Sequence, residues 1–137
     1  MSRAGARPEQ KRVLVADHAA SSRDLLRSIL EESNYVVAEA ADCEQLLESF
    51  RAFKPHLVII DLQLPRLDGC AAVAALRQIP VLRQTPVIAM TAALTLTAPE
   101  EIFETGFSTY LVKPIAPARL RRCVASALQG NYIERMF

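Results

Sequence analysis

Four residues whose side chains can do chemistry together each follow a short apolar run. The residues that come directly after a run of three or four apolar residues are Asp17, Asp61, Thr91 and Lys113. A carboxylate can attack phosphorus as a nucleophile, and an ammonium can pair with a phosphoryl oxygen as a point charge. Any one of these residues alone is more often a plain surface group. Their recurrence at the same place after four separate runs favours a shared site.

The segments between these runs show the spacing of helices. We predict strands at 13–16, 35–38, 57–60, 87–90 and 110–112, and helices at about 21–33, 42–54, 70–79 and 97–105. A last helix is expected to carry Leu120, Val124 and Leu128 inward and to end near Gly130. Several strands are continuous apolar runs, which is typical of strands covered on both faces. Right-handed crossovers then place helices on both sides of one parallel sheet. The fold expected is a doubly wound α/β domain with five strands and five helices, in which the strand ends converge on one edge.

Two helices carry start signals that the structure can test. Ser21 with Asp24 has the spacing of a capping box at the start of the first helix. Asp42 and Gln45 open the second helix, which Pro55 ends. The apolar face of the first helix is predicted to comprise Leu25, Leu26, Ile29 and Leu30.

Length and composition indicate one globular domain. The chain has 137 residues, of which 51% are hydrophobic and 23% charged, with a formal net charge of +1. This balance gives no reason to expect binding to nucleic acid or to a membrane, and no apolar run approaches the ~18 residues of a membrane span. Three widely spaced cysteines, Cys43, Cys70 and Cys123, favour a reduced, cytoplasmic setting over disulfides or zinc. We expect a flexible arm at 1–10, a domain at 11–130 and a tail at 131–137.

Four stretches of the chain resemble response regulator receiver domains of two-component signalling, the CheY-like superfamily. They are VLVADHAASSRDLLRSIL, PHLVIIDLQLPRLDGC, PVIAMTA and YLVKP, in that order along the chain. The second contains Asp61, Pro65, Asp68 and Gly69 at the spacing of the phosphoacceptor segment. The resemblance covers about residues 11–130 and implies the flavodoxin-like strand order 2-1-3-4-5.

The resemblance also implies roles for individual residues. Asp61 would accept a phosphoryl group from a histidine kinase or a histidine phosphotransfer protein, so the domain would be no enzyme beyond its own phosphorylation and dephosphorylation. Lys113 and Thr91 would contact the phosphoryl group, and the Lys113–Pro114 peptide bond would be cis. Mg²⁺, or Mn²⁺ as the alternative, would be held by Asp17, Asp61 and the backbone carbonyl of Gln63. Gln63 and Ala93 would flank the phosphoryl group.

The same resemblance predicts how a signal leaves the site. Thr91 and Tyr110 would move together as a switch, although an aromatic residue at Tyr110 is equally expected as plain packing. The surface of the fourth helix, the fifth strand and the fifth helix would then change shape for an unknown downstream protein or a homodimer partner. Candidates for contacts on that surface are Phe107, Arg119 and Arg122.

His18 departs from the family pattern, because the family usually has two adjacent acidic residues where this chain has Asp17 and His18. Three interpretations stay open: weak Mg²⁺ binding through Asp17, Asp61 and water; a degenerate receiver that acts only as a protein-interaction module; or a preference for a softer metal that His18 helps to bind. A phosphoaspartate-type hydrolase is disfavoured, because Gln63 stands where such enzymes need a second Asp. Nucleotide binding is disfavoured, since no glycine-rich phosphate-binding motif is present.

Overall fold

The computed structural model describes residues 10–64, 84–92, 100 and 107–130. The described elements are β1 (Arg12–Ala16), α1 (Ala20–Glu32), β2 (Val36–Ala40), α2 (Cys43–Phe53), β3 (Leu57–Asp61), β4 (Val87–Thr91), β5 (Thr109–Val112) and α5 (Pro117–Leu128). Several sequence predictions fall outside the described residues: the third helix and nearly all of the fourth, the arm, the tail, Cys70, Ala93 and the segment from Pro65 to Gly69.

The strands form one parallel sheet in the order β2-β1-β3-β4-β5. Every residue of β3 and β4 is buried, which confirms the interpretation of their apolar runs as strands covered on both faces. The predicted strand order is confirmed. The second strand lies later in the chain than predicted, because Tyr35 precedes it and Glu39 and Ala40 belong to it.

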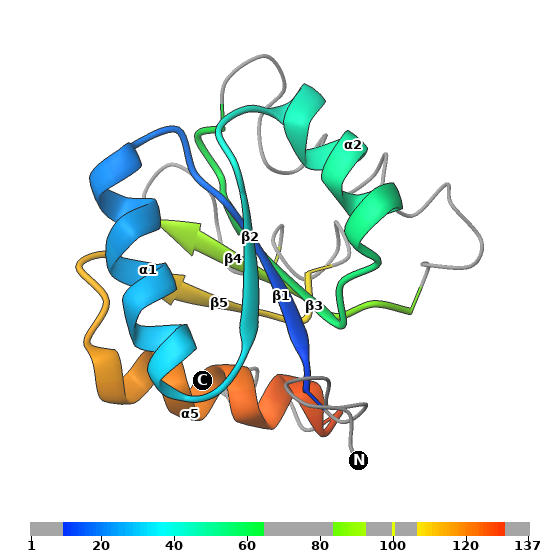
Figure 1. Ribbon diagram of the computed structural model, residues 1–137. Helices are drawn as coiled ribbons and strands as arrows, with labels where there is room; N and C mark the ends of the chain where they lie inside the picture. Colours follow the sequence, from blue (N-terminus) through cyan, green and yellow to red (C-terminus); the bar gives the residue numbers. More distant parts are fainter. Residues whose placement is uncertain (1–9, 65–83, 93–99, 101–106, 131–137) are drawn as a thin grey trace.

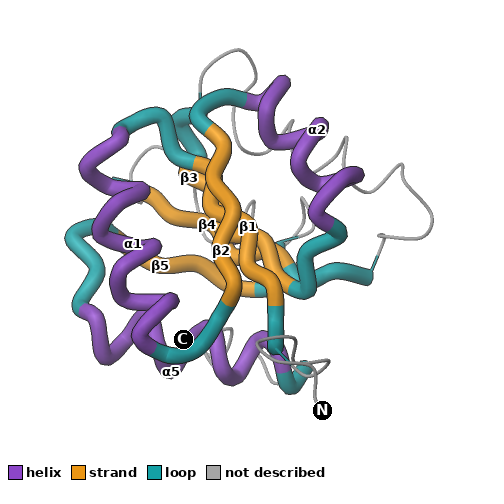
Figure 2. The backbone as a smooth tube through the Cα atoms, viewed as in Figure 1, coloured by secondary structure: helices purple, strands orange, loops and turns teal. Residues whose placement is uncertain are grey.

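Two apolar clusters fill the space on either side of the sheet. Alternate residues of each strand point to opposite faces, so Leu14 and Val58 pack with α2, whereas Val13 and Ile59 pack with α1 and α5. Figures 1 and 2 show the same layers, with α1 and α5 on one side of the strands and α2 on the other. The same alternation sets which face of the sheet each residue at a strand end points toward.

The start of α1 differs from its prediction. Ala19 occupies the N-cap position and no side chain caps the helix, so the predicted capping box of Ser21 and Asp24 is wrong. The Asp17 carboxylate accepts a hydrogen bond from the Ala19 N–H at 2.9 Å instead. A residue that belongs to the strand end therefore binds the backbone just before the helix.

The predicted apolar face of α1 is only partly right. Leu26, Ile29 and Leu30 are buried, but Leu25 is 55% exposed. One residue along a helix turns the side chain by about 100°, which moves Leu25 to the edge of the buried stripe. Leu25 is therefore a surface residue on the flank of the helix.

The second and last helices follow their predictions more closely. Asp42 caps α2 by accepting a hydrogen bond from the Gln45 N–H at 2.8 Å, and the helix ends before Pro55 with Lys54 at a positive φ. Leu120 and Val124 of α5 are buried, and Leu128 is partly buried against the same cluster, as predicted. None of the described helices combines the length and the hydrophobicity that a membrane span needs.

Candidate functional site

Two carboxylates meet at the carboxyl edge of the sheet. Asp17 directly follows β1, is fully buried, and donates its backbone N–H to the Ala40 carbonyl at 3.0 Å. Asp61 is the last residue of β3 and is also buried. Since β1 and β3 are neighbours in the sheet, these like charges lie side by side, as the sequence predicted.

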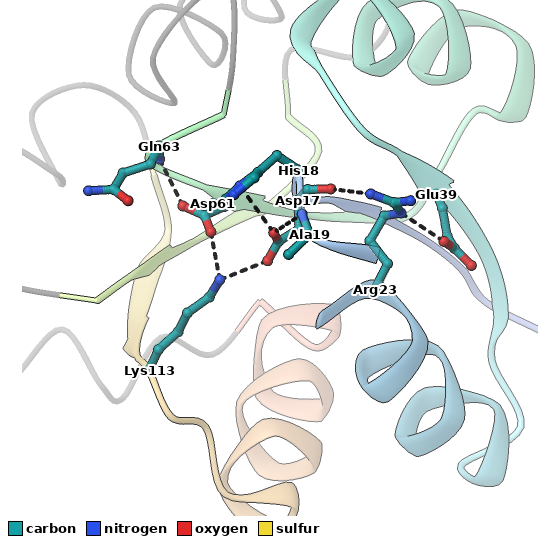
Figure 3. Close-up of polar contacts among 8 residues, drawn as sticks. All are labelled: Asp17, His18, Ala19, Arg23, Glu39, Asp61, Gln63 and Lys113. Carbon is teal, nitrogen blue, oxygen red and sulfur yellow. Dashed lines mark hydrogen bonds and ion pairs between the residues drawn. The ribbon is translucent and has the colours of Figure 1, made fainter. Parts of the chain in front are cut away.

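Lys113 joins the two carboxylates. Its Nζ atom lies 2.8 Å from Asp17 Oδ2 and 2.6 Å from Asp61 Oδ2 (Figure 3). The Lys113 backbone N–H donates to the Thr91 carbonyl at 2.8 Å, which fixes the start of this side chain beside β4. The peptide bond to Pro114 is cis, as predicted. Residues from three strand ends thus converge on one pocket, which is the geometry the sequence required.

The other oxygen of each carboxylate is held by the chain that follows it. Asp17 Oδ1 accepts from the Ala19 N–H at 2.9 Å, and Asp61 Oδ1 accepts from the Gln63 N–H at 2.8 Å. Both are hydrogen bonds to the backbone two residues on, a turn that Asp side chains form readily. The same local motif therefore orients both carboxylates, with Oδ2 facing Lys113 and Oδ1 facing the loop.

The pocket keeps its charges despite burial. Burial alone would raise the pKa of Asp17, but hydrogen bonds from Lys113, Ala19 and Ser22, with the Lys113 charge, leave that pKa below its ordinary value. Burial alone would lower the pKa of Lys113, but hydrogen bonds to Asp17 and Asp61 and their charges raise it. An ionised Asp17 and a charged Lys113 are therefore the stable forms at neutral pH.

The structure also describes three more of the predicted site residues. Thr91 is buried at the end of β4, and its carbonyl accepts the Lys113 N–H. Tyr110 is half-buried on β5 and packs against the cluster beside α2. Gln63 has an exposed side chain, and its N–H is the group that binds Asp61. Their roles in phosphorylation or signalling remain predictions.

His18 lies next to the carboxylates with its ring largely exposed. Its Nδ1 atom is 3.7 Å from Asp17 Oδ1, and its side chain is 55% exposed. One ligand atom from each of Asp17, His18 and Asp61 lies within 4.8 Å of the others, which is close enough to share one metal ion. Two carboxylate oxygens and an imidazole nitrogen suit a divalent cation. The residues present therefore fit a divalent metal.

The pocket and fold agree with comparisons to known proteins. Residues 13–125 match the sequence profile of the response regulator receiver domain. The chain belongs to this family. It is 34% identical over 124 residues to the probable transcriptional regulator ycf27 of Porphyridium aerugineum, a match that covers 88% of this chain and 49% of that protein. It is 30% identical over 111 residues to the chemotaxis protein CheY of Thermotoga maritima, covering 80% of this chain and 91% of CheY.

The receiver domain spans about half the length of ycf27 but nearly all of CheY. A solved structure gives the same likeness: the receiver domain of sensor histidine kinase PA1611 from Pseudomonas aeruginosa PAO1, with magnesium coordinated in its active-site cleft. That structure shares 26% identity and a TM-score of 0.80 with this chain, covering 89% of it and 99% of the other chain. The predicted family and fold are thus confirmed.

A network that sequence reasoning missed supports the loop before α1 of the receiver domain. Arg23 donates from Nη1 to the Asp17 carbonyl at 2.7 Å and from Nε to Glu39 Oε1 at 3.0 Å (Figure 3). Glu39 on β2 also pairs with Arg27. Glu39 is a charged residue inside an otherwise apolar strand, which was the available signal. Arg23 thereby anchors the backbone that carries Asp17 and His18.

A mainly apolar groove adjoins the pocket of the receiver domain. Its lining includes Leu25 and Ile29 of α1, Ala92 after β4, and Lys113, Pro114 and Ile115 before α5. Lys113 therefore belongs both to the charged pocket and to the wall of the groove. The exposed Leu25, displaced from the predicted helix face, is part of this surface.

Proposed function

We propose that this receiver domain takes a phosphoryl group from a phosphohistidine partner onto Asp61 and catalyses only its own modification. The observation that carries the proposal is the position of Lys113 Nζ, 2.6 Å from Asp61 and 2.8 Å from Asp17. A nucleophilic carboxylate, a second carboxylate and a fixed cation are the groups that phosphoryl transfer to Asp requires.

The transfer exchanges one bond for another. A carboxylate oxygen of Asp61 forms the bond to phosphorus as the phosphorus–nitrogen bond of the phosphohistidine breaks, and the electron pair leaves with the imidazole nitrogen, which takes up a proton. Lys113 pairs with a phosphoryl oxygen, and the Thr91 hydroxyl donates to another. Because these groups are held before the donor arrives, catalysis consists mostly of positioning and charge neutralisation.

A divalent ion, when bound, supplies the remaining positive charge beside the phosphoryl oxygens. Asp17 and Asp61, with the Gln63 carbonyl, would hold it. The related Pseudomonas aeruginosa domain coordinates magnesium, so Mg²⁺ and Mn²⁺ are both candidates for this pocket. Asp17 is suited to this because hydrogen bonds keep it ionised even though it is fully buried.

The described part of the output surface supports signalling through β5 and α5. The Lys113 N–H binds the Thr91 carbonyl, so movement of Thr91 toward a phosphoryl group acts directly on β5. Tyr110 is half-buried on the same strand, and Arg119 and Arg122 are exposed on α5. Phe107 is buried, so the prediction that it contacts a partner is wrong.

The groove beside Lys113 supports docking of the phosphohistidine partner there. Lys113 pairs with Asp61 and also lines the groove, so the apolar wall that includes Leu25 and Ile115 begins beside the proposed phosphoacceptor. An apolar patch next to a charged pocket offers hydrophobic contact for the partner and leaves the reacting groups polar. The downstream protein and any homodimer use other surfaces in this proposal.

The second candidate function is a receiver that binds partners without being phosphorylated. The observation in its favour is His18, which stands where the family usually has an acidic residue. The pocket therefore has one carboxylate fewer to balance the charge of a metal ion. Both candidates share the fold and the docking groove, so only the chemistry at Asp61 separates them.

The deciding experiment uses a small phosphodonor. The full chain is incubated with acetyl phosphate and Mg²⁺ or Mn²⁺, and intact mass spectrometry measures the addition of one phosphoryl group. We expect the wild type to be modified and Asp61→Asn to stay unmodified. Glu32→Gln, which alters an exposed carboxylate at the last residue of α1, the end of the helix that leads into β2, serves as the matched control and should be modified normally. Absence of labelling with either ion would favour the phosphorylation-independent module.

A further inference from the structure

The two faces of the carboxylate pair differ in what they offer a cation. Lys113 occupies the Oδ2 side of both Asp17 and Asp61. On the Oδ1 side of Asp17 lies His18, whose Nδ1 is 3.7 Å away. Figure 3 shows the ring nitrogen of His18 directed toward the two carboxylates, on the side away from Lys113. A metal ion at this pocket therefore meets an imidazole where a receiver usually offers a third acidic group.

The charge of the pocket also differs from that of a site with three carboxylates. Asp17 and Asp61 contribute two negative charges, and the Lys113 ammonium offsets one of them. Neutral imidazole adds a ligand atom but no charge. Mg²⁺ dehydrates reluctantly and prefers carboxylate oxygens, whereas imidazole nitrogen suits first-row transition ions. The donor set therefore weakens the site for Mg²⁺ more than for a transition ion.

The exposure of His18 leaves room for the rest of the coordination sphere. Its side chain is 55% exposed while Asp17 is fully buried, so an ion between them has a protein side and a solvent side. Open positions for water or phosphoryl oxygens are what a metal needs in order to take part in phosphoryl transfer. A structural site closed by four protein ligands would lack them.

We propose that His18 is a metal ligand and that the Asp17–His18–Asp61 cluster selects a divalent transition ion such as Mn²⁺, Co²⁺ or Ni²⁺ over Mg²⁺. This deepens the proposed function, because it names the ion that assists phosphorylation of Asp61. Ion binding is nevertheless measurable without any phosphodonor, so the two ideas can fail separately. The competing description is that His18 is a solvent-facing loop residue that the ion does not contact.

The first test measures binding of Mg²⁺ and Ni²⁺ by isothermal titration to the wild type, His18→Asp and His18→Ala. We expect His18→Ala to weaken Ni²⁺ binding by about tenfold or more and to change Mg²⁺ binding by less than about threefold. His18→Asp should strengthen Mg²⁺ binding by about tenfold, because it restores a charged oxygen ligand. Equal Ni²⁺ affinity in the wild type and His18→Ala would overturn the proposal.

The second test observes the ligand directly. Mn²⁺ bound to the full chain is studied by electron spin-echo envelope modulation, which detects nitrogen coordinated to the ion. We expect nitrogen modulation in the wild type and its loss in His18→Ala. The chain has only one other histidine, His56, so His56→Asn is the matched control and should keep the signal. Bound Mn²⁺ without nitrogen modulation would refute ligation by His18.

The acetyl phosphate assay on the same samples separates this inference from the proposed function. Labelling of Asp61 together with absent nitrogen modulation means that the domain is phosphorylated and that His18 is not a ligand. Nitrogen modulation without any labelling means that His18 binds metal in a receiver that is not phosphorylated.

Discussion

The two edges of the sheet carry similar residue types but use them differently. At the amino-terminal edge, His56 accepts a hydrogen bond from the Arg12 N–H at 2.9 Å, and the Arg12 guanidinium donates to the carbonyls of Phe53 and Lys54. At the carboxyl edge, Asp17 and Asp61 share Lys113. Both edges thus combine a cation with acceptor groups.

The two edges differ in the groups that surround the cation. Arg12 binds neutral backbone carbonyls and is partly exposed, so its edge holds no buried excess charge. At the other edge two buried carboxylates share one ammonium, and one negative charge stays without a counter-charge from Lys113. Placing like charges together in this way costs stability, and proteins keep such arrangements mainly where function uses them. The amino-terminal edge is therefore structural, whereas the carboxyl edge holds the groups proposed for phosphoryl transfer.

The largest expected effect comes from removing Lys113, which would expose this cost. Lys113→Met keeps the length of the side chain but leaves Asp17 and Asp61 without their shared cation. We expect the free energy of unfolding, measured by urea denaturation at neutral pH, to fall by roughly 2–3 kcal/mol, a figure reduced from the buried-pair range because Lys113 is 25% exposed.

A double variant sharpens the test of Lys113. Lys113→Met with Asp61→Asn leaves a single carboxylate, so its loss of stability should be smaller than the sum of the two single changes. A loss below about 1 kcal/mol for Lys113→Met alone would show that the pocket is not under charge strain, and the contrast between the two edges would then disappear.

The second effect concerns access to the carboxyl edge. Leu25 lines the groove beside the pocket and is 55% exposed. Val36 is 38% exposed but lies at the start of β2, near the opposite edge of the sheet. We expect Leu25→Ala to slow phosphotransfer from a phosphohistidine protein by about tenfold. This factor corresponds to a loss of about 1.4 kcal/mol of binding free energy between the two proteins. Labelling by acetyl phosphate should not change, because Leu25 lines the groove and takes no part in the polar contacts that hold Asp61.

The matched control for Leu25 is Val36→Thr, which removes exposed apolar surface at the other edge with almost no change of shape. It should leave both the phosphotransfer rate and the labelling by acetyl phosphate unaltered. Equal slowing of transfer by the two variants would mean that the groove beside Lys113 is not the docking surface.

The contrast between the edges also explains which features the sequence could predict. Asp17, Asp61 and Lys113 were predictable because each ends an apolar run, and parallel strands bring their ends to one edge. The Asp42 cap of α2 was predictable for a similar reason, since the acceptor and the Gln45 N–H lie three residues apart. In these cases the spacing along the chain or the direction of the strand fixes the contact.

Other features depend on side chains that meet only after folding. Nothing in the local sequence pairs Arg23 with Glu39, sixteen positions away, or places the Arg12 guanidinium on the carbonyls before His56. The cap of α1 was mispredicted because the helix begins at Ala20, so Ser21 lies inside its first turn and not at the N-cap. The Asp17 carboxylate, outside the helix, accepts the Ala19 N–H. Leu25 was wrongly predicted to be buried, because the buried face of α1 is narrower than the sequence of its leucines indicated.

The smallest effect is a pH dependence at the structural edge. The pKa of His56 lies below its ordinary value of 6.5, first because of burial and then because of the nearby charges of Arg12 and Lys11. The folded state therefore binds the proton less readily than the unfolded chain. Its contribution to stability is complete above pH 6.5 and is lost as the pH falls through the lower native pKa.

Asp17 has the same sign but a different window. Its pKa is also lowered, so its contribution is lost only as the pH falls below its ordinary value of 3.8 and through the native pKa. Denaturation between about pH 7.5 and about pH 5 therefore reports on the amino-terminal edge with little contribution from the pocket. The two edges can be titrated separately in one protein.

His56→Asn isolates the histidine, because the amide oxygen of Asn can accept the Arg12 N–H in place of Nδ1 but does not titrate. Between these two pH values we expect the wild type to lose about 1 kcal/mol more stability than the variant, the usual value of one hydrogen bond. His18→Gln, which changes the exposed histidine at the other edge, should keep the wild-type pH dependence. If His56→Asn and the wild type lost stability in parallel, protonation would not break the contact between His56 and Arg12, and the amino-terminal edge would owe its stability to the Arg12 guanidinium alone.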